Sequence, residues 1–90
     1  MEKITLLDQV VLNSRLVPVE NHRKVVAYLA VVLLKARFAD LSCYFGRSEK
    51  EVRKVVTVYA VKLSKNTSFA SVLFELTKRF YVSELINEVV

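Results

Sequence analysis

Apolar residues recur every three or four positions along most of this chain, which is the spacing of one face of an α-helix. The pattern then breaks at Leu16-Val17-Pro18-Val19, because a residue that precedes proline is pushed towards extended backbone. We therefore expect a first helix over residues 3–13 and an extended connection after it. The apolar positions in register on this helix are Ile4, Leu7, Val10 and Val11.

The longest apolar run, Val25–Leu34, is too short for a membrane span, which needs about twenty residues. It predicts a central, largely buried helix, which we place at Glu20–Arg37 with Asn21 as its N-cap. A helix spreads consecutive side chains over every direction, so part of the run should remain exposed and favour a homodimer. The expected inward positions are Val25, Tyr28, Leu29, Val32 and Leu33, and the expected surplus is Val26, Val31 and Leu34.

Three further helices are expected, over Phe38–Phe45, from Ser48 to about Lys65, and over about Ser68–Glu88. Gly46 marks the turn between the first two, since glycine adopts a positive φ without steric cost. Ser48 and Glu51 have the spacing of a capping box. The Ser48 hydroxyl would accept the N–H of Glu51, and the Glu51 side chain would reach back to the N–H of Ser48.

The inward faces of these three helices follow from the same period, and Asn66-Thr67-Ser68 should cap the start of the last one. The expected core positions are Leu41, Tyr44 and Phe45 on the first, Val52, Val55, Val56, Tyr59, Ala60 and Leu63 on the second, and Phe69, Val72, Leu73, Leu76 and Phe80 on the last, which Leu85, Ile86 and Val89 extend. The whole pattern predicts an all-α fold of about five helices. We expect one domain over residues 1–90, with an N-terminal helix and connection over 1–19 and a helical core over 20–90.

The composition narrows the chemistry that this domain can perform. The single cysteine, Cys43, cannot form a disulfide within the chain, and the first residues carry acids where a secretory signal would be basic. We therefore expect a cytoplasmic protein, with Cys43 buried on its short helix. No Cys/His cluster or converging pair of carboxylates is apparent, and His22 stands alone. These observations predict no enzyme activity, no cofactor, no metal site, no small-molecule substrate and no membrane association.

Positive charge is concentrated in the middle of the chain. Residues 23–65 carry ten Lys and Arg against three acidic residues, a net charge of +7, whereas the segments on either side each sum to −1. A patch of this kind either favours polyanions such as nucleic acid or forms a solubilising face over a very hydrophobic core, and charge alone does not separate the two. The basic segment 23–65 contains the short helix, the glycine turn and the basic helix predicted over residues 38–65. That order of elements is typical of a helix-turn-helix, whose second helix can enter a DNA major groove.

From Arg23 onward the sequence resembles the C-terminal DNA-binding domain of the bacterial replication initiator DnaA. RKVVAYLAVVLL is similar to that family's central helix with its R-x-x-x-x-Y-L-A signature. FADLSCYFGRSEKEVRKVV is similar to its FG-R-D-H-T-T-V segment, through the residues Phe38, Leu41, Phe45, Gly46, Arg47 and Val52. The resemblance covers about residues 20–80. It implies a helix-turn-helix of Trp-repressor and DnaA type, binding double-stranded DNA.

The chain departs from this family where the family reads DNA. Ser48-Glu49-Lys50-Glu51 stands in place of an Asp-His-Thr-Thr run, and the preceding loop, LNSRLVPVEN, keeps Arg15 as its only arginine. Carboxylates at Glu49 and Glu51 repel phosphate. The phosphate-binding sequence of the family's motor domain is absent.

Two functions follow. The first is a small bacterial or phage-like regulator of transcription or replication that binds double-stranded DNA in the nucleoid. The alternative is a degenerate DnaA-like helical module that acts through protein–protein contacts or dimerisation without specific DNA binding. For the first, the expected DNA-binding residues are Arg37, Arg47, Ser48, Glu49, Lys50, Arg53, Lys54 and Thr57.

Overall fold

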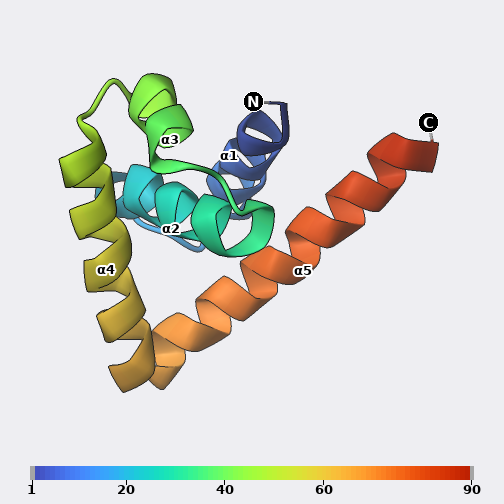
Figure 1. Ribbon diagram of the computed structural model, residues 1–90. Coiled ribbons are helices and arrows are strands. Elements are labelled where there is room, and N and C mark those ends of the chain that lie inside the picture. Colours follow the sequence, from blue (N-terminus) through green and yellow to red (C-terminus); the bar gives the residue numbers. More distant parts are fainter. Residues whose placement is uncertain (1, 90) are drawn as a thin grey trace.

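The computed structural model describes residues 2–89, and the side chains of residues 2–86. This part of the chain folds into five α-helices and one short 3-10 helix, with no strand (Figure 1). The elements are α1 (Glu2–Ser14), η1 (Val19–Asn21), α2 (His22–Leu34), α3 (Phe38–Phe45), α4 (Glu49–Lys65) and α5 (Thr67–Val89). The all-α prediction with about five helices is therefore confirmed.

Helix α2 occupies the centre of the molecule because, after its polar first turn, it is apolar in every direction from Val25 to Ala30. Each of the six residues from Val25 to Ala30 is buried, and α2 packs against all four other α-helices. Val26, predicted to be surplus to the inward stripe, is fully buried, whereas Val32 is 52 % exposed. The other helices enclose the middle of α2 and leave both its first turn and its last turns partly open. Val31 and Leu34 are half-buried against the core.

The ends of α2 differ from the prediction. Its start is preceded by the turn of η1, and Asn21 occupies the N-cap position with no hydrogen bond from its side chain. Its end comes at Leu34, because Lys35 adopts a left-handed conformation with φ of 54°. The N–H of Ala36 then bonds the carbonyl of Ala30, which closes the helix. Arg37 consequently lies outside α2, at the N-cap position of α3.

Each of the other helices contributes apolar side chains to the same core. From α1 come Ile4, Leu7 and Val11, from α3 Leu41, from α4 Val52 and Tyr59, and from α5 Leu73, Leu76 and Phe80. The remaining predicted core positions on α3, α4 and the first half of α5 are half-buried, except Ala60, which is exposed. Cys43 is also exposed, contrary to the prediction, because two residues turn a helix by about 200° and carry it away from the face of Leu41.

Helix α5, with 23 residues, extends beyond the other four α-helices (Figure 1). The Asn66 side chain accepts the N–H of Phe69 at 3.0 Å and caps the start of the helix, as predicted. The last turns run past α1 and away from the other helices (Figure 1). Leu85 and Ile86, which we expected to extend the core face, are 62 % and 56 % exposed. The predicted contribution of Val89 falls outside the described side chains.

Candidate nucleic-acid interface

The turn between α3 and α4 is built by Gly46 and the two residues after it. Gly46 has φ of +65°, and its N–H and that of Arg47 both point to the carbonyl of Ser42. The Ser42 hydroxyl donates in return to the carbonyl of Arg47. These bonds close the end of α3 and fix the backbone of the turn, and α4 begins three residues after Gly46.

The predicted capping box forms in one direction. The Ser48 hydroxyl accepts the N–H of Glu51 at 3.2 Å, which satisfies one of the free donors at the start of α4. The Glu51 carboxylate does not return the bond. It lies instead 3.9 Å from the Arg47 guanidinium, with both side chains exposed. The charge of Glu51 is thus turned towards a neighbouring cation rather than towards the helix terminus.

One face of α4 is polar and exposed, and the opposite face carries the buried Val52 and Tyr59. The exposed face has the residues predicted from the helical period: Lys50, Arg53, Lys54 and Thr57. Thr57 is less available than expected, since its hydroxyl donates to the carbonyl of Arg53 at 2.9 Å. It keeps only acceptor capacity towards a ligand.

The cations on this face are free of carboxylates. Lys50, Arg53 and Lys54 form no ion pair with any described residue. The Arg53 guanidinium lies 5.1 Å from the centre of the Phe38 ring, which holds it beside the first turn of α3 while its charge stays unneutralised. Glu49, also exposed and unpaired among the described residues, is the acid that interrupts this face.

Arg37 lies away from the turn at Gly46, next to the Phe38 ring that Arg53 contacts. It stands at the opposite end of α3 from Arg47, about 12 Å away along an eight-residue helix. Its side chain forms an ion pair with Asp40 at 3.2 Å, and both line a hollow with Glu2 at the start of α1. The structure therefore brings Arg47 to Thr57 together, and Arg37 adjoins this group only at Arg53, through the neighbouring Phe38.

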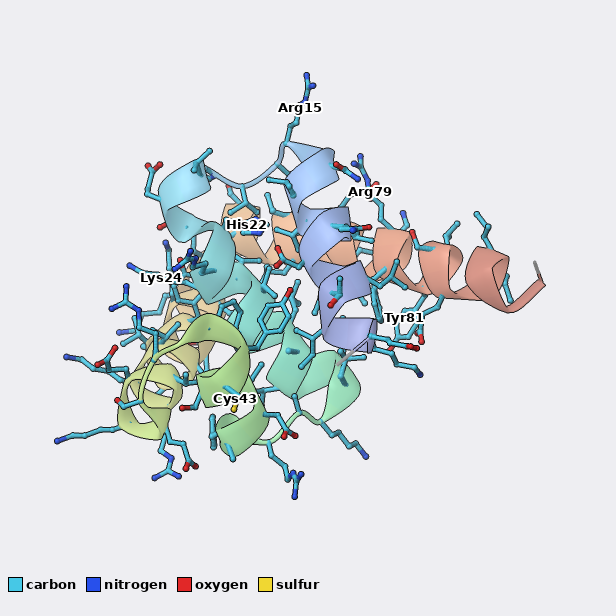
Figure 2. The ribbon with its side chains drawn as sticks, turned by 90° about the horizontal axis from the view of Figure 1, so that it is seen from above. Arg15, His22, Lys24, Cys43, Arg79 and Tyr81 are labelled. Atoms are coloured by element: carbon cyan, nitrogen blue, oxygen red, sulfur yellow. The ribbon has the colours of Figure 1, made fainter. Side chains whose placement is uncertain are left out.

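A hollow of about 730 Å³ adjoins the start of α4 and contains cations that the motif analysis did not select. Its walls come from the α1–α2 connection, the first turns of α2, and the α3–α4 turn. The apolar lining includes Val17, Phe45 and Val52. The charged lining has four basic residues and two acidic ones, Arg15, Arg23, Lys24 and Arg47 with Glu20 and Glu51. Figure 2 shows Arg15 projecting from the connection and Lys24 pointing outward from α2.

Arg23 and Lys24 form no ion pair with a described residue. Both belong to the basic segment 23–65, so the concentration of charge was the signal that could have identified them. The sequence could not show that they share one hollow with Arg47, because that depends on how α2 packs against α4.

A polar contact joins α1, α2 and α3 close to the turn between α3 and α4. Asp8 on α1 accepts the Tyr44 hydroxyl of α3 at 2.8 Å, and its other carboxylate oxygen contacts the His22 ring at the start of α2. Burial, followed by this hydrogen bond, raises the pKa of Tyr44 above its ordinary value of 10.0. The His22 side chain therefore takes part in the contact that joins α1 to α2.

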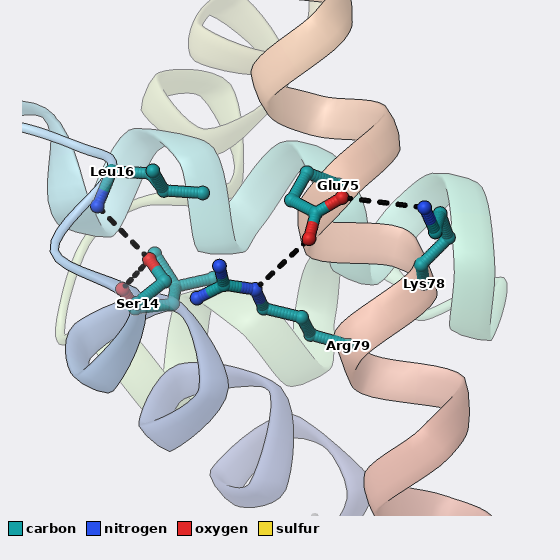
Figure 3. A network of polar contacts seen from close by, with 6 residues as sticks. Ser14, Leu16, Glu75, Lys78 and Arg79 are labelled. Atoms are coloured by element: carbon teal, nitrogen blue, oxygen red, sulfur yellow. Dashed lines mark hydrogen bonds and ion pairs between the residues drawn. The ribbon is translucent and has the colours of Figure 1, made fainter.

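Lys3, Lys78 and Arg79 on the α1–α5 side of the molecule are paired with carboxylates, in contrast to the cations on the exposed face of α4. Arg79 and Lys78 lie 3.3 and 3.5 Å from the Glu75 carboxylate (Figure 3), and Lys3 lies 3.0 Å from Glu84. The hydrogen bond from Arg79 and the nearby charge of Lys78 lower the pKa of Glu75 below its ordinary value. Positive charge on this side is therefore locally balanced.

Other kinds of site find no support in the part of the chain that the structure describes. No group of three or more His, Cys, Asp or Glu side chains could hold a metal ion in residues 2–86. Among the described helices, none combines the length and apolar character needed to cross a membrane. Comparisons with models of protein families, with curated proteins and with solved structures gave no match.

Proposed function

We propose that this protein binds double-stranded DNA, with α3, the Gly46 turn and α4 acting as a helix-turn-helix and α4 entering the major groove. The observation that carries the proposal is the asymmetry of charge. Most cations on α4 and in the adjoining hollow form no ion pair with a described residue, Arg47 beside Glu51 being the exception. Lys3, Lys78 and Arg79 lie against carboxylates instead. Phosphate binding costs less free energy at an unpaired cation, because no internal ion pair has to break first.

The geometry of α4 suits a groove-binding helix. Its polar face is presented over its first three turns, from Lys50 to Thr57, next to a turn whose hydrogen bonds fix the helix direction. Arg47, Arg23 and Lys24 lie at the start of α4, where they could contact phosphates on either side of the groove. The resemblance of residues 20–80 to the DnaA DNA-binding domain points the same way and suggests a regulator of replication or transcription.

A duplex-binding measurement tests this proposal. We expect Arg53→Ala/Lys54→Ala to weaken binding to a fluorescently labelled random duplex at least tenfold. The salt slope of the binding constant should fall by about one unit for each phosphate that the variant no longer binds. Anisotropy titrations at two or more salt concentrations give both quantities.

The matched control is Lys3→Ala/Arg79→Ala, which removes the same number of positive charges, two, from the α1–α5 side. It should stay within about twofold of the unaltered protein. Equal reductions in affinity in the two double variants would mean that net charge alone drives binding. Unchanged affinity and salt slope in Arg53→Ala/Lys54→Ala would reject α4 as the DNA-contacting helix.

A further inference from the structure

Helix α5 has two apolar faces, and the core uses only one of them. Leu73, Leu76 and Phe80 point into the core and are buried. On the opposite side, Phe74, Tyr81 and Leu85 are 68 %, 52 % and 62 % exposed. An exposed row of large apolar side chains on a helix that leaves the body of the molecule is typical of an interaction surface.

The exposed row has the spacing of a helix–helix seam. Phe74, Lys78, Tyr81 and Leu85 follow one another at intervals of four, three and four residues, which is the alternation found along a coiled coil. Lys78 belongs to this row through its stem, and its ammonium lies 5.7 Å from the centre of the Phe74 ring. The order four-three-four reads the same from either end of the helix.

We propose that a second copy of this chain covers this row, with the two α5 helices packed antiparallel about a two-fold axis. Because the spacing is symmetric, one register places every member of the row opposite another member. Phe74 then faces Leu85 of the partner subunit, and Lys78 faces the partner subunit's Tyr81. Each contact occurs twice, as a two-fold interface requires.

Charge favours a second copy over nucleic acid as the occupant. Within residues 71–86 the two cations, Lys78 and Arg79, are balanced by Glu75 and Glu84, so two copies meet without net repulsion. The Glu75 carboxylate already holds Lys78 and Arg79. A phosphate backbone would meet apolar side chains and paired charges on this surface.

The extent of the row sets the strength of the dimer. From Phe74 to Leu85 the seam is about 16 Å long, which places it among the small interfaces that associate weakly. We expect a dissociation constant on the order of 10–100 µM. A lysine at a seam position fixes the register at a cost in stability, so Lys78 limits the affinity while selecting this pairing.

This proposal is independent of DNA binding, since self-association is measured without DNA. In sedimentation equilibrium between about 10 and 500 µM, the mass should rise from 10.3 kDa towards twice that value. Leu85→Lys should weaken association at least tenfold, and Lys78→Leu should strengthen it at least tenfold. Leu12→Lys is the matched control, because Leu12 on α1 is 59 % exposed and lies outside the row. Circular dichroism confirms that each variant stays folded.

A monomer mass at every concentration would overturn the proposal, and so would equal weakening in Leu85→Lys and Leu12→Lys. Cysteine cross-linking then tests the antiparallel register. In a Cys43→Ser background, oxidation should join Phe74→Cys to Leu85→Cys when the two variants are mixed, and neither variant should join to itself. The antiparallel register separates like positions by about 16 Å, beyond the reach of a disulfide. Self-linking of each variant alone would show a parallel pair and reject the two-fold arrangement.

Discussion

Tyr44 is the residue whose side chain ties the short helix α3 to the N-terminal helix α1. Its hydroxyl donates to Asp8 at 2.8 Å, and its ring lies edge-on to Phe45 with the two centres 5.0 Å apart. Because α3 precedes the turn that directs α4, this contact holds the proposed DNA-binding unit against the rest of the fold. Periodicity placed Tyr44 on the inward face but could not identify its partner, which lies 36 residues earlier in the chain.

Tyr44→Phe tests this contact at the residue scale. The variant should lose about 1 kcal/mol of unfolding free energy at pH 7, the usual net value of one hydrogen bond. The pKa of Tyr44 is raised in the folded state, so its contribution is complete below pH 10 and is lost as pH rises through the raised pKa. Stability should therefore fall less steeply above pH 10 in Tyr44→Phe than in the unaltered protein.

Urea unfolding at pH 7, 10 and 11 gives this comparison. Burial also raises the pKa of Tyr59, and both proteins share that contribution, so only the difference between them is informative. If the free energy of unfolding fell equally steeply above pH 10 in both proteins, the pKa of Tyr44 would be the same in the folded and unfolded states, and the interpretation would be rejected.

At the scale of the elements, three helices end in left-handed backbone, and only one of them uses glycine. Arg15 follows α1 with φ of 59°, Lys35 follows α2 with φ of 54°, and Gly46 follows α3 with φ of 65°. A residue with a Cβ pays about 1–2 kcal/mol for this conformation. The sequence predicted a left-handed residue only at the third of these ends. It also predicted the end of α1, through the break before Pro18, but it did not mark the end of α2 at Lys35.

Two opposite substitutions test this interpretation of the helix ends. Gly46→Ala should destabilise the protein by about 1 kcal/mol, because a Cβ at Gly46 would meet open space and the cost is conformational alone. Lys35→Gly should stabilise it by a similar amount, less the entropy that glycine adds to the unfolded chain. Denaturant midpoints at constant m-value measure both changes. Gly46→Asn serves as the control and should cost less than alanine, since asparagine tolerates this region.

At the scale of the whole molecule, the position of charge matters more than its total. The chain carries +5 overall, yet Lys3, Lys78 and Arg79 on the α1–α5 side are paired with carboxylates. Lys50, Arg53 and Lys54 on α4 form no ion pair with a described residue. Glu49 stands alone within the free cations on α4. If this surface binds a duplex, the carboxylate of Glu49 repels phosphate at close range.

Glu49→Gln is accordingly expected to raise affinity for random duplex DNA by about threefold to tenfold at low salt. The matched control is Glu2→Gln, which makes the same change in net charge at the start of α1 and should leave affinity within about twofold. Anisotropy titrations of the two variants side by side give the comparison. Equal increases in affinity would indicate that the surface near α4 has no special role.

The sequence by itself determined where the turn and the α-helices would form, apart from the ends of α2. The helix bounds near residues 38–45 and 49–65, the left-handed Gly46 and the caps at Ser48 and Asn66 all depend on residues within one turn of each other. The polar face of α4 was predictable for the same reason. Local hydrogen bonds and side-chain period carry this information, so no knowledge of the fold was needed.

Only the tertiary structure decided which apolar faces are covered. Val26 is buried and Val32 exposed on the same helix, and α5 leaves Phe74, Tyr81 and Leu85 outside the core. The tertiary fold likewise placed Arg23 and Lys24 in one hollow with Arg47, and placed Arg37 in another. Burial and proximity depend on which elements pack against a face. Those elements come from distant parts of the chain, and the period of a single helix is the same whether one side or both are covered.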